Sequence, residues 1–209
     1  MKRLLPALAL PLLLAACGGG TPSLSGQVGM TANLTGADIE STLTITTDAT
    51  TGQVTGLSIK QLSEQPTLRV VVAPASLGVT LTGIEVTVVD AAGITYSKVF
   101  RQALAERVPS GYACKATVEA TQPLVPLTDQ CDYSLKMPYA KTVDVANVPV
   151  IDATTTGQAA FDFASRYSDL TACPDLSLNV RLLGFDDLRR EIQPIVITRA
   201  PIQETCNVL

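Results

Sequence analysis

The alternation of apolar and polar residues along several short stretches constrains the fold of this chain more than any other feature. Apolar residues occupy every second position in 176–182, and Leu43 and Ile45 alternate with threonines in 42–46. This period of two is typical of strands with one buried face. Charged residues make up only 16% of the chain, against roughly 25% in typical domains. The pattern therefore predicts an all-β fold.

Turn residues divide these stretches into hairpins. Asp, Ala, Thr and Gly form the turns at 48–52 and 90–93, and a polar turn spans 185–190. We also expect three other strands, of which the last alternates Phe inward and Asp outward: 67–73 (ended by Pro74), 78–82 (a short edge strand) and 159–163. The predicted hairpins join 43–46 to 54–59, 84–89 to 94–100, and 176–184 to 191–198.

Two stretches leave alternatives open. Residues 97–108 are compatible with a short helix that ends before Pro109, and 101–150 is predicted to be an irregular, disulfide-bridged insertion. A chain divided into two small β domains near 102–111 is the alternative to one domain. Residues 48–53 recur in similar form at 152–158, which either reflects duplication of an Ig-sized unit or two local turns of the same chemistry.

The order of these elements from Leu68 onward resembles a bacterial Ig-like domain. A Val-rich strand ends at Pro74, a hairpin turns at 90–93, and a Phe-x-Phe strand precedes the closing hairpin. The resemblance implies an Ig-like antiparallel β-sandwich over residues 41–209, with an N-terminal hairpin. The chain has no Trp, so it departs from the Cys–Trp–Cys core of antibody domains. The resemblance implies a fold rather than a function.

The N-terminus carries the marks of export. Lys2 and Arg3 precede an apolar run at 4–16, which is too short to span a bilayer as a helix. The sequence Leu14-Ala15-Ala16-Cys17 resembles the lipobox of bacterial lipoproteins. A plain secretory signal with a chance cysteine is the alternative.

The lipobox resemblance implies an anchored protein. Residues 1–16 would be a signal peptide, cut before Cys17, whose thiol and new amine would carry acyl chains. Two or more acyl chains hold a protein stably in a membrane. Residues 17–40 are predicted to be a flexible tether, since 18–29 are rich in Gly, Ser, Thr and Pro. Gly18, rather than Asp, favours the outer membrane or cell surface, facing the periplasm or the exterior.

Four cysteines remain beside Cys17, namely Cys114, Cys131, Cys173 and Cys206. An even number in an exported protein indicates disulfides, and three pairings are possible. The predicted closing hairpin would bring Cys173 and Cys206 together, and Cys114 and Cys131 similarly bracket the loop at 121–123, so the spacing favours these two pairs. Four thiols on one metal are the alternative, but the chain has no CxxC spacing, and we predict no metal site.

The chain contains no histidine. This excludes Ser-His-Asp and Cys-His nucleophilic sites and HExxH metalloproteases. Ser58 with Lys60, and Ser134 with Lys136, have the spacing to share one side of a strand, but surface positions are the preferred interpretation over a Ser–Lys dyad.

Carboxylates are the remaining candidates for chemistry. Asp186 and Asp187 lie on the closing turn beside Arg189 and Arg190, so this turn is either a solvated loop or a Ca²⁺ or partner contact. A further acidic set lacks the regular spacing of a calcium loop: Asp152, Asp162 and Asp169.

The net charge of −4 and the pI near 4.8 give no electrostatic footprint for nucleic acid. We therefore expect a non-enzymatic, lipid-anchored envelope protein that serves as a structural or protein-interaction module without a cofactor. Its partners would be the membrane, through acyl chains on Cys17, and an envelope protein or surface ligand. A solute- or ion-binding lipoprotein is the main alternative, and a hydrolase using carboxylates is a third.

Overall fold

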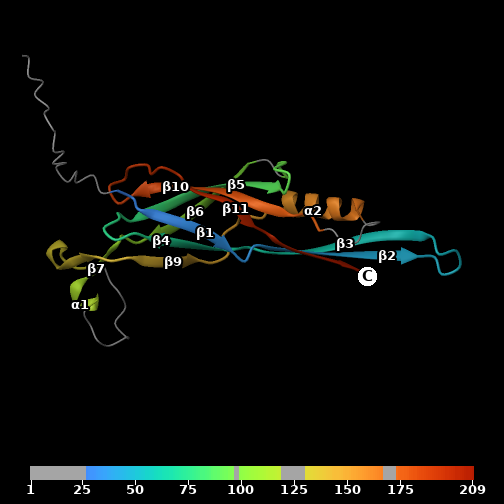
Figure 1. The fold of residues 1–209 in the computed structure, drawn as a ribbon, viewed down its shortest axis with the longest axis horizontal. Helices are drawn as coiled ribbons and strands as arrows, with labels where there is room; N and C mark the ends of the chain where they lie inside the picture. The colour runs from blue at the N-terminus through green and yellow to red at the C-terminus, as the bar shows by residue number, and fades with distance from the viewer. Residues whose placement is uncertain (1–26, 97–98, 119–129, 167–172) are drawn as a thin grey trace, which may run out of the picture.

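The computed structural model describes residues 27–96, 99–118, 130–166 and 173–209. The predicted lipidation site Cys17 and the carboxylate of Asp169 lie outside these residues. The molecule is elongated and mostly β, with a long hairpin that extends beyond a broader body (Figure 1).

Two antiparallel sheets make the body. The first has the order β1 (Met30–Thr35), β4 (Thr67–Val72), β9 (Lys141–Val145). The second has the order β11 (Ile195–Pro201), β10 (Leu176–Asp186), β5 (Val79–Asp90), β6 (Phe100–Val108). We call these two sheets the core body.

One hydrophobic core joins the two sheets. Leu68, Val70 and Val72 of β4 are fully buried, as are Val180 and Leu182 of β10, and they belong to a single cluster. Each side chain alternates with a polar or exposed neighbour, because successive residues of a strand point to opposite faces. Even Val71 is 44% exposed, so the valine run of β4 buries only one face.

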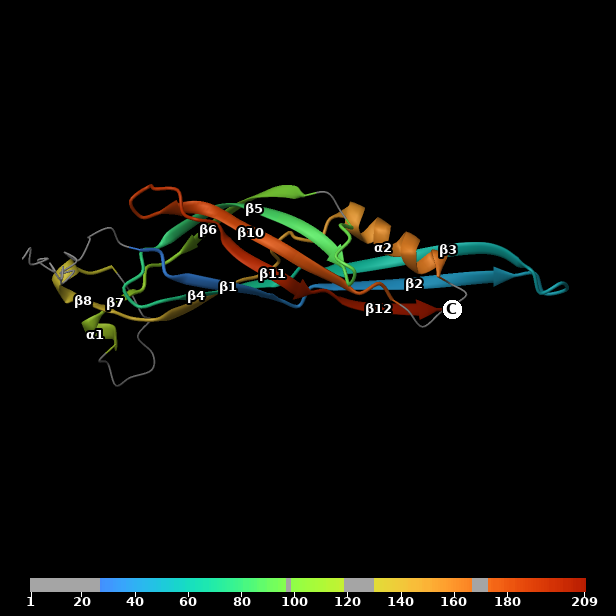
Figure 2. The same cartoon turned by 45° about the horizontal axis from the view of Figure 1, so that its top comes forward.

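The part of the long hairpin that extends beyond the body forms, together with the last strand of the chain, a separate sheet, which we call the arm. It has the order β12 (Gln203–Val208), β2 (Asp38–Thr47), β3 (Val54–Glu64), with β12 parallel to β2. The chain passes from β1 to β2 at 36–37 and from β3 to β4 at 65–66, so one antiparallel ladder runs through both body and arm. Figure 2 shows the arm continuing past the body, with helix α2 (Ala153–Ser165) beside it.

Helix α2 begins at an Asp cap. The carboxylate of Asp152 accepts hydrogen bonds from the backbone N–H (2.8 Å) and the hydroxyl of Thr155, as N-cap residues do. Thr155, Ala159 and Phe163 are buried at helical spacing, whereas Phe161 is 69% exposed. The strand predicted at 159–163 is therefore wrong. A strand would place Phe161 and Phe163 on the same face, whereas the helix buries only Phe163.

Four small elements occupy the end of the body opposite the arm (Figure 1). Strands β7 (Tyr112–Cys114) and β8 (Lys136–Pro138) pair, next to the short helices α1 (Lys115–Val118) and η1 (Tyr133–Leu135). The predicted irregular insertion at 101–150 is thus too long, since β6 and β9 lie inside it as sheet strands. The helix considered for 97–108 is wrong in the described part, which is β6.

Other predictions have mixed outcomes. The β2–β3 and β10–β11 hairpins are confirmed with shifted ends. The third hairpin is confirmed at its turn, but the described part of the return strand predicted at 94–100 has only an isolated bridge at Thr95, and the regular strand β6 begins at Phe100. The short edge strand predicted at 78–82 is the start of β5, a central strand of 12 residues. The tether predicted to reach residue 40 is too long, because β1 already begins at Met30. The all-β prediction needs correction for α2, and the all-antiparallel prediction for the parallel pair of β2 and β12.

Candidate binding groove between two sheet edges

An open groove of about 830 Å³ lies between β1 and the β10–β11 turn. One wall comes from the N-terminal stretch 27–32 and the other from residues 190–196. β1 and β11 are edge strands of different sheets, and they pack against each other without being hydrogen-bonded neighbours. The groove lies at this seam, beside partly buried apolar side chains that pack against the core.

Core side chains form the apolar part of the groove. Val28, Met30, Ala32 and Ile195 are partly buried and pack against the core cluster. Val196 is 57% exposed at the rim. A half-covered strip of core residues, flanked by polar groups, is the usual composition of a binding surface.

The charges at the groove's turn neutralise each other. The side chain of Asp186 is 4% exposed, and its Oδ2 accepts from Arg190 Nε at 2.7 Å. Its Oδ1 accepts from the backbone N–H groups of Leu188 and Arg190, both at 2.9 Å. Burial opposes ionisation, but these hydrogen bonds and Arg190 hold the pKa of Asp186 below its usual value.

The neighbouring Asp187 also has protein partners. It binds Arg107 at 2.5 Å and accepts from the backbone N–H of Gly78 at 2.9 Å. Asp187 therefore ties the closing turn to the body, whereas Asp186 closes the turn on itself, and the hydrogen-bond and ion-pair partners of both carboxylates are groups of this chain. This arrangement favours the structural interpretation of the turn over the Ca²⁺ contact.

A second polar cluster lies where α2 meets the β5–β6 hairpin, around a hollow of about 270 Å³. The Tyr96 hydroxyl donates to Asp162, which also binds Arg166 at 3.3 Å. Burial and the neighbouring Asp162 raise the pKa of Tyr96. Tyr96 is thus held as a neutral donor, and its hydrogen bond to Asp162 connects the β5–β6 hairpin to α2.

Glu204 lies next to this cluster at the start of β12. Its Oε1 accepts from the backbone N–H of Leu176 at 3.1 Å. The pKa of Glu204 is raised to about 8, chiefly because the carboxyl group is buried. The hydrogen bond from Leu176 lowers this pKa, and the nearby carboxylate of Asp175 raises it further. This carboxyl group is therefore largely protonated at neutral pH.

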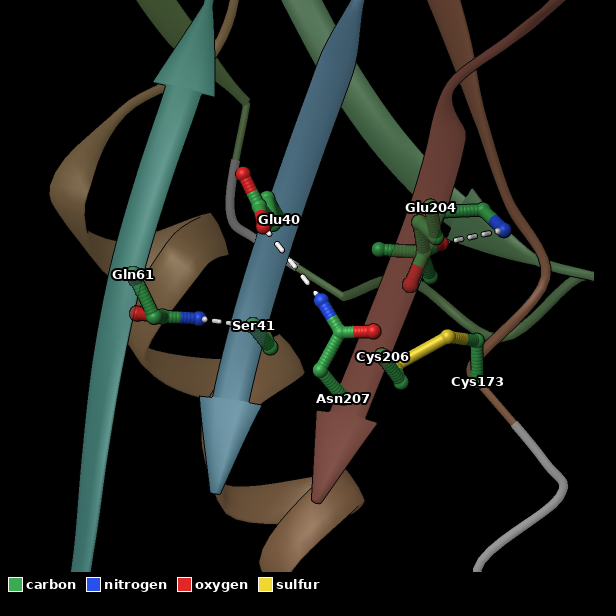
Figure 3. Close-up of a disulfide and its surroundings, with 8 residues drawn as sticks. Glu40, Ser41, Gln61, Cys173, Glu204, Cys206 and Asn207 are labelled. Atoms are coloured by element: carbon green, nitrogen blue, oxygen red, sulfur yellow. Dashed lines mark hydrogen bonds between the residues drawn. A yellow bond between two sulfur atoms is a disulfide. The ribbon is translucent and has the colours of Figure 1, made fainter. Parts of the chain in front are cut away.

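The structure has two disulfide bonds, Cys114–Cys131 and Cys173–Cys206, the pairing that the spacing favours. Their Cα atoms are 6.1 and 5.8 Å apart, respectively. Figure 3 shows the second bond joining β12 to the segment that leads into β10, close to Glu204. This bond holds the outer strand of the arm to the core body.

The remaining sequence candidates are scattered. Ser58 and Lys60 are exposed on β3, and Ser134 is exposed in η1, so neither Ser–Lys pair is enclosed. Asp152 and Asp162 lie at opposite ends of α2 and have separate partners. Across the described residues, no group of three or more acidic or cysteine side chains is placed to hold a metal ion.

Sequence reasoning missed the groove and the Glu204 cluster. The groove combines residues 27–32, which read as tether, with a turn more than 150 positions later (186 − 32 = 154). Glu204 stands alone in a polar C-terminal stretch, and no local pattern marks its burial. Only the tertiary arrangement brings these residues together.

No helix within the described ranges has the length and apolar character needed to cross a membrane. No protein-family model matches the chain, and no curated protein matches it significantly. A functional assignment therefore depends on the geometry described above.

Proposed function

We propose that this chain is a lipid-anchored cell-envelope protein that presents an Ig-like β-sandwich as a protein-interaction module, without catalysis. The membrane is one partner, through acyl chains on Cys17. The other is an extended segment of an envelope protein at the same membrane, which docks in the groove beside β1. The two disulfides support a location outside the reducing cytoplasm.

The groove is the observation that supports this proposal most. β1 and β11 belong to different sheets, so their facing edges are not paired with each other. Unpaired edges are templates for another strand, and apolar pockets beside them accept alternate side chains. Met30, Ala32 and Ile195 supply such an apolar strip.

The position of the groove fits a partner close to the membrane. Gln27 lines the groove and follows Cys17 by ten residues (27 − 17 = 10). Ten extended residues span at most about 35 Å. The groove would therefore lie within that distance of the acyl chains, while the arm points away from this end (Figure 1).

A solute-binding lipoprotein is the second candidate, and the groove's volume favours it. Small-molecule pockets commonly measure about 300–1,000 Å³, and this groove of about 830 Å³ falls within that range. The side chains of Asp186 and Arg190 bind each other. A solute would thus rely on apolar contacts and on the other polar side chains of the lining, such as Gln27, Glu191 and Gln193.

Site-specific photo-crosslinking in intact envelopes tests the proposal. A photoreactive residue replaces Val196 at the groove rim in one variant and Val71 on the outer face of β4 in the control; both are exposed. We expect a discrete protein adduct from position 196 and none from position 71. Equal labelling at both positions, or no protein adduct at 196, would overturn the protein-interaction proposal. Displacement of labelling at 196 by a small-molecule extract would favour the solute.

A further inference from the structure

The outer edge of β3 is open over a long, regular stretch. The arm has two edge strands, β12 and β3, and β2 lies between them (Figure 3). The pairing with β2 is regular from residue 56 to 64, with the irregularity confined to the tip, and no Pro interrupts the strand. Within the described part of the chain, β2 is the only strand that pairs with β3.

Three exposed residues at every second position of β3 share one face of the arm. Lys60, Leu62 and Glu64 alternate with residues that point to α2, since the Gln61 side chain donates to Thr156 O at 2.7 Å. Leu62 is 55% exposed. Lys60 and Glu64 have no ion-pair partner among the described residues.

The charge on this face favours a basic group beside Glu64. The register of the arm places Glu64 opposite Asp38 and Leu62 opposite Glu40, so three carboxylates gather there. Like charges directly opposite each other are unfavourable in a sheet. The only lysine on this strand is Lys60, which faces Thr42 instead.

We propose that β3 pairs antiparallel with β3 of a second copy, about a twofold axis at Leu62. The stretch 60–64 is self-complementary under this operation. Leu62 meets Leu62 of the second copy, and Lys60 of each copy lies opposite Glu64 of the other. A twofold contact requires this property, because the same patch serves both sides. The two arms form one continuous sheet, and the open β3 edge of each copy is covered.

Charge reversal tests the register. In analytical ultracentrifugation of the full-length lipidated chain in mild detergent, the unaltered protein forms a dimer. Lys60→Glu or Glu64→Lys alone places like charges opposite each other twice, which weakens dimerisation about tenfold. An equimolar mixture of the two variants restores the dimer, because the acidic positions of one copy then face the basic positions of the other. The double variant also dimerises like the unaltered protein.

Cysteine crosslinking gives an independent readout. Leu62→Cys places two thiols side by side on the axis, so a disulfide-linked dimer forms under mild oxidation. Ser58→Cys is the matched control on the same exposed face. Its two thiols would be eight residues apart along the paired strands, or about 26 Å, and no crosslink is expected.

A monomer at all concentrations, without the Leu62→Cys crosslink, would overturn the pairing. So would a dimer that both single charge reversals leave intact, or equal crosslinking at positions 58 and 62. The contact uses no residue of the groove, so these results do not depend on the photo-crosslinking outcome.

Discussion

The core body and the arm share one antiparallel ladder, yet they bury very different amounts of side chain. In the body, Leu68 and Val70 of β4 are fully buried beneath the second sheet. In the arm, Leu57 and Leu62 of β3 are 46% and 55% exposed. The strands alternate similarly in both halves, so burial depends on what packs against them.

A single helix is the main cover of the arm. Helix α2 packs against β2 and β3, where Ile39 and Leu43 are buried, but the tip beyond it is exposed. Stability should therefore come chiefly from the core body. The arm should depend on its attachments, which are α2, β12 and the Cys173–Cys206 bond.

The largest single loss of stability should come from removing one disulfide at a time. The Cys173–Cys206 bond closes 33 residues, so replacing both cysteines by Ser should lower the free energy of unfolding by about 4 kcal/mol. The loss should fall first on the arm, with faster hydrogen exchange in β12 than in β10. The matched control replaces Cys114 and Cys131 by Ser. It removes a bond that closes 17 residues, so it should lower the free energy of unfolding by about 3 kcal/mol. Unchanged exchange in β12 would show that the bond does not hold the arm.

Truncating one leucine in each half measures the contrast directly. Leu68→Ala leaves a cavity in the core body and should lower the free energy of unfolding by about 3 kcal/mol. Leu57→Ala in the arm should cost less than about 0.5 kcal/mol, because the side chain is half exposed. Urea denaturation of both variants gives the two values. Similar costs would contradict the contrast between body and arm.

The stability of the protein should depend on pH through Glu204, which lies where β12 of the arm meets β10 of the core body. Its pKa is about 8 in the folded protein, against about 4.3 in an unfolded chain. Between these values folding takes up a proton, so stability is full below the lower pKa and falls as the pH rises towards 8. Glu204→Gln should raise the melting temperature by a few degrees at pH 7.5 and leave it nearly unchanged at pH 4. An equal effect at both pH values would show that ionisation of Glu204 is not involved.

The smallest expected difference concerns the two Asp-Ala-Thr-Thr segments. Asp152→Ala removes the cap of α2 and should cost about 1 kcal/mol. Asp48→Ala removes hydrogen bonds at the exposed tip of the arm, and we expect a smaller loss. Thermal unfolding of the two variants tests the order, and a larger loss for Asp48→Ala would reverse it.

These two segments also show how far the sequence predicts the structure. Asp48 accepts from the backbone N–H of Thr51 at 2.7 Å, and Asp152 from that of Thr155 at 2.8 Å. The local motif is therefore the same, and local turn chemistry accounts for the repeat. One copy closes a hairpin and the other starts a helix, because different residues follow: a strand pairs with β2 after the first, whereas Ala159 and Phe163 line a helical face after the second.

Local patterns thus predicted the hairpins, and cysteine spacing favoured the pairing found in the structure. They did not predict β1, whose six residues 30–35 hold few large apolar side chains and gain their order from pairing with β4. The groove could not be predicted for the same reason, since one of its walls is the start of this strand.

The proposed anchor on Cys17 can be tested through the mass of the mature N-terminal peptide. Mass spectrometry of the protein from bacterial envelopes should find Cys17 as the first residue, carrying a diacylglyceryl group and an additional acyl chain. The Cys17→Ser variant should lack these groups and move from the membrane to the soluble fraction. An unmodified Cys17 in a membrane-bound protein would show that acyl chains on Cys17 are not what holds the protein at the membrane.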